Sequence, residues 1–143
     1  MIELVAASDT FFQFAETLVV SHLTPFYQAS GVDWSPAQFR EHWAHSQNFM
    51  LHVDHAVVGF VSLMFTPRVL TIRDIELASR YQRQGIGRWT VGRLEQWAAE
   101  QDRERIRANV LSSNPARLFY ERLGFEPIGK DDDIVQLEKV VKA

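Results

Sequence analysis

The stretch Ile75-Glu76-Leu77-Ala78-Ser79-Arg80-Tyr81-Gln82-Arg83-Gln84-Gly85-Ile86-Gly87-Arg88 is the segment that decides the fold. An apolar strand ends at Leu77, a polar turn follows, and a loop with two glycines leads into a helix expected to end near Asp102. The first N–H groups of a helix lack intrahelical acceptors, and the helix dipole places positive charge there. Such a loop is a ready site for an anion. Arg83 and Arg88 add donors that suit a phosphate or pyrophosphate.

Three kinds of phosphate-binding loop can be compared with this segment. The P-loop requires G-x-x-x-x-G-K-[S/T], which the sequence does not contain. The dinucleotide fingerprint requires a third glycine at position 90, where the chain has Thr90, and it belongs directly after the first strand of a βαβ unit. The third pattern, Q/R-x-x-G-x-G/A, begins at Gln82 and fits without a gap.

The hydrophobic pattern on either side of this loop predicts alternating strands and helices. The expected strands cover residues 3–6, 48–53, 56–65, 69–77, 106–111, 125–130 and 134–140. Helices are expected along the apolar stripe Phe11 to His22, from the capping pair Ser35-Pro36, from Ile86, and from Ser113-Asn114-Pro115 to Gly124. Residues 24–33 contain proline and glycine and are expected to form an irregular loop. The resulting order, βααβββαβαββ, indicates an α/β or α+β layer fold.

The strand over residues 69–77 has a shift in its apolar alternation. Leu70 and Ile72 occupy even positions, whereas Ile75 and Leu77 occupy odd ones. Because strand side chains alternate with period two, one extra residue near Arg73-Asp74 would explain the shift. The sequence is thus compatible with a β-bulge there, a feature common beside active sites, or with a regular strand buried on both faces.

Composition excludes several classes of function. The 143 residues contain no cysteine, which rules out disulfide scaffolds, thiolate metal sites and thiol nucleophiles. The net charge is −3, so nucleic-acid binding is disfavoured despite four arginines and no acidic residue between Arg80 and Arg93. His42 and His45 are three apart, but no cysteine or suitably spaced carboxylate supports a metal site. No membrane span or signal peptide is expected, so we predict a single domain over residues 1–143 in the cytoplasm.

Two segments together resemble the GNAT superfamily of N-acetyltransferases. Ile75 to Gly87 looks like the acetyl-CoA motif of that family, and Asn114 to Phe125 is similar to its asparagine, tyrosine and glycine–phenylalanine segment. One helix and one strand separate the two, as in the family. The resemblance covers about residues 2–140, and its specific part is Ile75 to Phe125. It implies a GNAT-like, mixed but mostly antiparallel twisted sheet of about seven strands with four flanking helices.

The resemblance also implies that acetyl-CoA is the co-substrate and that no metal is needed. Amides from about Gln84 to Arg88 would bind the CoA pyrophosphate, and the end of the strand before the loop would pair with the pantetheine amides. Asn114 would contact the pantetheine arm, and Tyr120 would lie near the thioester sulfur. The cofactor-binding residues expected on this basis are Ile75, Leu77, Gln82, Arg83, Gln84, Gly85, Ile86, Gly87, Arg88 and Asn114.

The chemistry of amine acetylation requires an acid and a base. A primary amine is protonated at pH 7, and losing that proton costs roughly 4 kcal/mol, so a base or water chain must accept it. The departing thiolate needs a donor, and a tyrosine of ordinary pKa can serve. We therefore expect Tyr120 to act as the general acid. The alternative is that Tyr120 is only an aromatic residue of the core. As the general base we favour Glu76 acting through water. Asp74 and a water chain are the alternatives for this role.

The acceptor is expected to be a primary amine of a small molecule or peptide. Phe26, Tyr27 and Trp34 lie where the family closes one side of the acceptor cleft, and they could hold an apolar acceptor or fill the core. Residues 131–133 form either an acidic rim of the cleft or a simple hairpin turn. A non-catalytic CoA-sensing or protein-binding module on the same fold is the alternative function. The sequence leaves open the oligomeric state, which is a monomer or a homodimer. It also leaves open whether the transferred group is acetyl or a longer acyl group.

Overall fold

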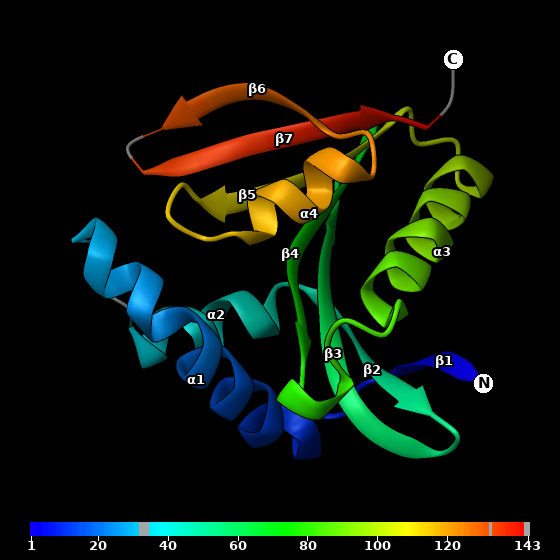
Figure 1. The fold of residues 1–143 in the computed structure, drawn as a ribbon. Helices are drawn as coiled ribbons and strands as arrows, with labels where there is room; N and C mark the ends of the chain where they lie inside the picture. Colours follow the sequence, from blue (N-terminus) through cyan, green and yellow to red (C-terminus); the bar gives the residue numbers. More distant parts are fainter. Residues whose placement is uncertain (32–34, 132, 142–143) are drawn as a thin grey trace.

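The computed structural model describes residues 1–31, 35–131 and 133–141, and over these ranges it contains the predicted order of elements, with seven strands and four helices (Figure 1). The strands are β1 (Ile2–Ala6), β2 (Gln47–Val53), β3 (Ala56–Phe65), β4 (Val69–Leu77), β5 (Arg105–Leu111), β6 (Glu126–Asp131) and β7 (Ile134–Val140). The helices are α1 (Phe12–Ser30), α2 (Pro36–Ala44), α3 (Ile86–Glu100) and α4 (Ala116–Arg122), and the 3-10 turns are η1 (Asp9–Phe11) and η2 (Ser79–Tyr81). The predicted fold class is confirmed.

The strands form one mixed sheet in the order β1-β2-β3-β4-β5-β7-β6. Within the described residues, β4 and β5 are the one parallel pair, and their pairing covers only Val69–Ile72 against Arg105–Ala108. Beyond this point β4 continues along β3 to Leu77, while β5 continues along β7 to Leu111. The two parallel strands therefore separate in the second half of their length and leave an opening in the middle of the sheet.

Of the two alternatives for the shift in alternation, the structure shows the β-bulge in β4. Ser62 of β3 pairs with Asp74, whereas the next residue, Leu63, pairs with Ile72, so Arg73 is the extra residue. A bulge bends its strand and increases the local twist. The bulge in β4 directly follows the last residue paired with β5, so it contributes to the separation of the two strands.

Helices cover both faces of the sheet, and each face has its own apolar core. On one face, α3 and α4 pack on the larger core, which includes Leu63, Leu94 and Tyr120. On the other face, α1 and α2 pack Trp43 and their other apolar residues against Phe60 and Met50. Helix α2 begins as predicted, because the Ser35 side chain accepts a hydrogen bond from the Gln38 N–H at 3.3 Å.

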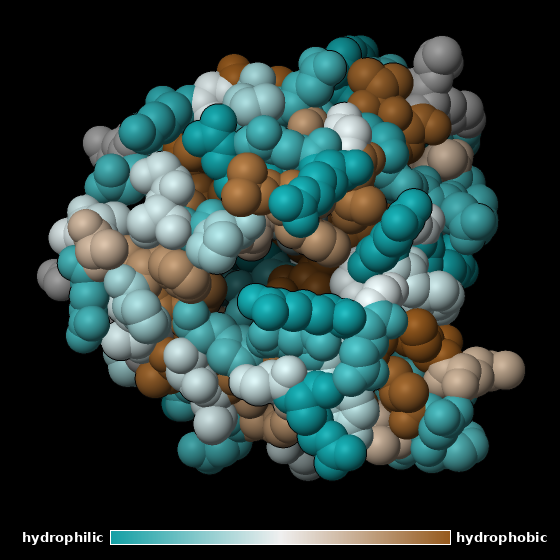
Figure 2. Space-filling model, viewed as in Figure 1, coloured by the Kyte–Doolittle hydropathy of each residue, from teal (hydrophilic) through white to brown (hydrophobic). Residues whose placement is uncertain are grey.

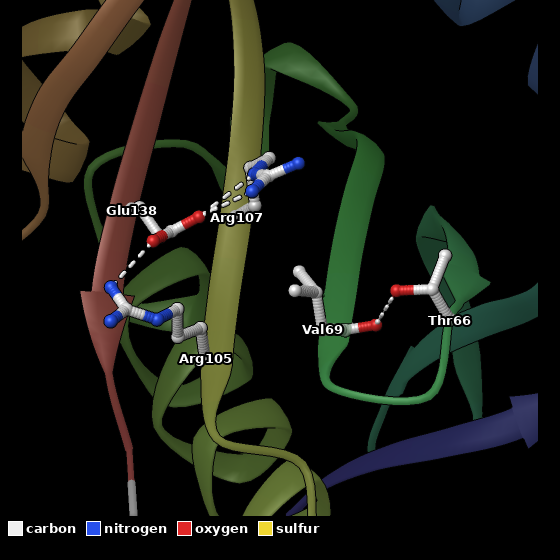
Figure 3. Close-up of polar contacts among 5 residues, drawn as sticks. All are labelled: Thr66, Val69, Arg105, Arg107 and Glu138. Atoms are coloured by element: carbon white, nitrogen blue, oxygen red, sulfur yellow. Dashed lines mark hydrogen bonds and ion pairs between the residues drawn. The ribbon is translucent and has the colours of Figure 1, made fainter.

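An ion-pair cluster joins β5 to β7 across the sheet (Figure 3). The Glu138 carboxylate accepts hydrogen bonds from Arg105 at 2.8 Å and from Arg107 at 2.6 Å. Burial opposes the charge on Glu138, but the hydrogen bonds from the two arginines outweigh it and hold the pKa of Glu138 below its ordinary value. At the start of β4, the Thr66 hydroxyl donates to the Val69 carbonyl and closes the β3–β4 turn (Figure 3).

The expectation of an irregular loop over residues 24–33 is wrong for residues 24–30. Helix α1 continues through Pro25 and ends only at Gly31, which has a φ of 74°. Proline inside a helix removes one backbone hydrogen bond and costs about 3 kcal/mol. Here Leu23 packs with the core beneath α1, and the Thr24 hydroxyl donates back to the Val20 carbonyl. Tertiary packing thus outweighs the local preference of proline. Trp34 lies outside the described residues.

Candidate active site

A cavity of about 580 Å³ opens between the glycine loop, the end of β4, and helices α1 and α4. Figure 2 shows the corresponding hollow near the centre of the displayed face, with hydrophobic atoms at its floor and hydrophilic side chains along its rim. Its lining contains eight of the predicted cofactor-binding residues, and it also contains both predicted catalytic residues. These are Ile75, Leu77, Gln82, Arg83, Gly85, Gly87, Arg88 and Asn114, together with Glu76 and Tyr120.

The glycine loop presents unpaired N–H groups to this cavity. The first intrahelical hydrogen bond of α3 runs from the Trp89 N–H to the Gly85 carbonyl at 3.0 Å, so the amides of Ile86, Gly87 and Arg88 precede it and have no intrahelical acceptor. Gly85 adopts a φ of 83°, a conformation that costs glycine little, and nothing lies within 4 Å of where a Cβ would stand. The loop is therefore an open anion site at the positive end of α3.

Two residues of the predicted binding loop turn their side chains away from the cavity. The Gln84 amide donates to the Arg80 carbonyl at 2.7 Å, which holds the preceding turn. The Ile86 side chain is 4% exposed and belongs to the core. These two residues can therefore contribute only their backbone N–H groups. Gln82 lines the cavity and also fastens the loop to β4, because its amide donates to the Leu77 carbonyl at 3.1 Å.

Helix α4 forms the opposite wall and is placed by local contacts. The Asn114 side chain accepts a hydrogen bond from the Ala116 N–H at 2.9 Å, which fixes the start of the helix. Gly124, with a φ of 97°, follows its end as predicted. Phe119 packs against the glycine loop so closely that a Cβ on Gly87 would lie 3.3 Å from its ring. A larger residue at position 87 would therefore require the Phe119 ring to shift by a few tenths of an ångström.

Tyr120 is 5% exposed and is held by aromatic neighbours on both sides. Its ring centroid lies 5.1 Å from that of Phe119 and 5.2 Å from that of Phe125. Burial raises the pKa of Tyr120, and the nearby carboxylates of Glu76 and Asp74 raise it further. The phenol therefore stays protonated at neutral pH and can act as a hydrogen-bond donor into the cavity.

A histidine on α1 pairs with the carboxylate of Glu76. His22 Nδ1 lies 3.4 Å from Glu76 Oε1, and both side chains are largely buried. Burial raises the pKa of Glu76. The hydrogen bond from His22 lowers this pKa but only partly offsets the effect of burial. That hydrogen bond in turn raises the pKa of His22. Sequence reasoning did not identify this pair, although His22 follows Leu18 by four residues on an otherwise apolar helical stripe, which was the available signal.

The opening between β4 and β5 connects this cavity to a second region. A small cavity of about 120 Å³ lies at the opening and shares Glu76 and Tyr120 with the first. It also shares Tyr27 and Asp74 with a further cavity of about 310 Å³ on the face covered by α1 and α2. Burial raises the pKa of Asp74 well above its ordinary value, and the charge of Glu76 raises it further. A continuous series of cavities thus crosses the sheet where its parallel strands separate.

The remaining expectations about the acceptor cleft have mixed outcomes. Phe26 lines the first cavity and Tyr27 lines the other two, whereas Asp131 ends β6 and Asp132 lies outside the described residues. Among the residues that the structure describes, no group of three or more His, Asp or Glu side chains could hold a metal ion. In the same part of the chain no helix is long and apolar enough to cross a membrane.

Comparisons with known proteins agree with this geometry. The model of the acetyltransferase (GNAT) family matches residues 16–125. No curated protein matches the chain in sequence. Among solved structures, the PaiA N-acetyltransferase of Thermoplasma acidophilum in complex with coenzyme A is similar at a TM-score of 0.76 and 16% identity, with 98% of this chain and 99% of that chain covered. A GNAT family acetyltransferase of Elizabethkingia anophelis with acetyl-CoA bound is similar at a TM-score of 0.71 and 16% identity, with 98% of this chain and 97% of that chain covered. The ribosomal-protein-S18-alanine N-acetyltransferase of Escherichia coli is similar at a TM-score of 0.70 and 20% identity, with 100% of this chain and 96% of that chain covered.

Proposed function

Because the chain belongs to the acetyltransferase (GNAT) family, we propose that it transfers an acetyl group from acetyl-CoA to a primary amine of a small molecule or peptide. The observation that carries this proposal is the cavity of about 580 Å³, which joins an anion-binding helix start to a buried tyrosine and a buried carboxylate. The similar structures from Thermoplasma acidophilum and Elizabethkingia anophelis, which contain CoA and acetyl-CoA, support it.

The glycine loop has the donor set that a CoA pyrophosphate needs. The free amides at the start of α3 and the side chains of Arg83 and Arg88 supply hydrogen bonds and positive charge, and the open space beside Gly85 admits a close approach. Beyond Ile72 the edge of β4 is no longer paired with β5, so backbone groups on that edge can pair with the pantetheine amides, except the Leu77 carbonyl, which accepts from Gln82. Asn114 lines the same cavity on the opposite wall. Acetyl-CoA supplies the thioester that carries the acetyl group.

Glu76 is the proposed base, with His22 as its partner. The acceptor arrives as an ammonium group, and its proton must be removed before its nitrogen can attack the thioester carbon. Glu76 lines both the first cavity and the opening between β4 and β5, where the amine and the thioester would meet. The raised pKa of Glu76 makes it a stronger base than a solvent-exposed carboxylate. His22, whose Nδ1 lies 3.4 Å from Glu76 Oε1, would orient this carboxylate as its hydrogen-bond donor.

Tyr120 is the proposed acid. When the new C–N bond forms, the C–S bond breaks and the sulfur leaves as a thiolate that requires a proton. The protonated phenol of Tyr120 lies in the same cavity and on the opposite side of the opening from α1. Its ring contacts with Phe119 and Phe125 hold it in place, which limits the entropy lost in reaching the reacting sulfur.

The proposal is tested by calorimetry with CoA and acetyl-CoA. We expect micromolar binding, on the order of −8 kcal/mol. Gly85→Asp should abolish it, because a carboxylate would meet the pyrophosphate and the residue would be strained at positive φ. Gly31→Asp is a matched control, since Gly31 also has a positive φ of 74° and open space around its Cβ position. No binding by the unaltered protein at millimolar CoA would refute the proposal, as would equal losses in both variants.

A further inference from the structure

Arg73, the extra residue of the β4 bulge, has a hydrogen-bond donor without an acceptor, and the charged group nearest to it along the chain is the carboxyl of Asp74. Its Nε is buried without a hydrogen-bond partner, and one terminal nitrogen contacts only the sulfur of Met64 at 3.0 Å. Within the described residues it forms no ion pair with a carboxylate. Arginine remains charged under all ordinary conditions, and a buried hydrogen-bond donor without an acceptor is costly. The guanidinium is therefore available to an anion that is not part of the described chain.

Arg73 faces the cavity of about 310 Å³ between the sheet and helices α1 and α2. Because of the bulge, Arg73 and the adjacent Asp74 both line this cavity, although neighbouring strand residues normally face opposite ways. The groups that face them from the other elements are mostly neutral: Tyr27 on α1, Gln38 and His42 on α2, Met64 on β3 and Asn109 on β5. Burial lowers the pKa of His42, and the charge of Arg73 lowers it further, so His42 adds no positive charge at neutral pH.

This cavity is the continuation of the path along which an acceptor would reach the thioester. Tyr27 and Asp74 are shared between it and the small cavity at the opening of the sheet, which in turn contains Glu76 and Tyr120. An amine placed beside Glu76 would therefore have the rest of its molecule directed toward Arg73. Arg73 itself also lines the small cavity, so one path holds carboxyl groups that suit an ammonium group and a guanidinium that suits an anion.

We infer that the acceptor is a small molecule that carries a carboxylate besides its amine, in the manner of a free amino acid, and that Arg73 binds this carboxylate. This inference rests on the proposed acetyltransferase function and narrows its substrate class. A single guanidinium forms a bidentate pair with a carboxylate, so its charge matches a monoanion. A phosphate dianion is disfavoured, because the carboxyl group of Asp74 lies beside Arg73 in the same cavity. Gln38 and Ser35 can supply the remaining, neutral hydrogen bonds.

The experiment compares free amino acids with their carboxamides as acceptors, under saturating acetyl-CoA. The two members of each pair differ only in the charged group that Arg73 is proposed to bind. We expect the unaltered protein to favour the amino acid in kcat/KM by about 10- to 100-fold, the range for a hydrogen bond to a charged group. Arg73→Gln should remove most of this preference, mainly through KM for the amino acid, and Arg73→Lys should restore part of it. Arg68→Gln, an exposed arginine just before β4 and outside all of these cavities, should keep the full preference.

A second measurement keeps the inference testable if turnover is slow or Arg73→Gln folds poorly. Calorimetry on the unaltered protein saturated with CoA should show binding of the amino acid and weaker binding of its carboxamide. Equal kcat/KM for acid and amide, equal binding of the two, or a preference that survives Arg73→Gln would overturn the inference. Failure to bind CoA at all would instead refute the proposed function, so the two failures are distinguishable.

Discussion

Replacing Tyr120 with phenylalanine separates the chemical role of its hydroxyl from the packing role of its ring. The ring contacts at 5.1 Å and 5.2 Å are available equally to phenylalanine. The hydroxyl makes no hydrogen bond to any of the described residues, so its loss leaves no buried partner unsatisfied. We therefore expect the free energy of unfolding to change by less than about 1 kcal/mol.

The same substitution should have a large effect on turnover. Losing a general acid lowers the rate by roughly 100-fold or more, which corresponds to about 2.7 kcal/mol of transition-state stabilisation. Acetyl-CoA affinity should change little, because the pyrophosphate contacts lie at the other end of the cavity. The assay is steady-state turnover on a confirmed acceptor, with calorimetry for acetyl-CoA and chemical denaturation as parallel readouts. Tyr81→Phe is the matched control, because Tyr81 lines none of the three cavities.

The pH dependence of turnover provides an independent check. Burial raises the pKa of Tyr120 above its ordinary value of 10.0, so the active, protonated form should persist through pH 10. Any loss of activity due to its ionisation should therefore appear only above that pH and be absent in the phenylalanine variant. Normal turnover in Tyr120→Phe, or an alkaline decline near pH 9 that this variant removes, would refute the assigned role.

Two further predictions concern the phosphate site and the stability of the sheet. Replacing Arg83 or Arg88 with alanine should weaken binding of CoA more than binding of pantetheine in calorimetry, and equal losses for both ligands would show that these arginines act through folding instead. Glu138→Gln should lower the free energy of unfolding at pH 7 by about 1 kcal/mol, at the low end for charged hydrogen bonds because its arginine partners are 48% and 32% exposed. Since the folded-state pKa of Glu138 is depressed, its contribution is present above the unfolded value near 4.5 and is lost as pH falls through the folded value. Denaturation at pH 7 and pH 3 should therefore show a smaller difference between the variant and the unaltered protein at pH 3, and a constant difference would contradict this assignment.

Local sequence patterns determined the elements and the cofactor side of the site. Alternation and helical periodicity predicted the order of strands and helices, since these signals depend only on residues near one another in the chain. The shift in alternation around Arg73 indicated a bulge or a strand buried on both faces, and only the strand pairing decided for the bulge. The loop from Gln82 to Arg88 was identifiable because a helix start, its glycines and its flanking arginines are contiguous.

Only the tertiary structure decided the acceptor side, because its groups come from distant parts of the chain. His22 and Glu76 are 54 positions apart and meet only when α1 packs on β4. Helix α1 itself extends past Pro25 because packing on the sheet outweighs the local cost of proline. Arg73 and Asp74 both face one cavity only because the bulge and the separation of β4 from β5 direct them there, and the groups from the other elements around them are mostly neutral. Charge pairing across a fold depends on three-dimensional proximity, which residue spacing along one strand or helix does not contain.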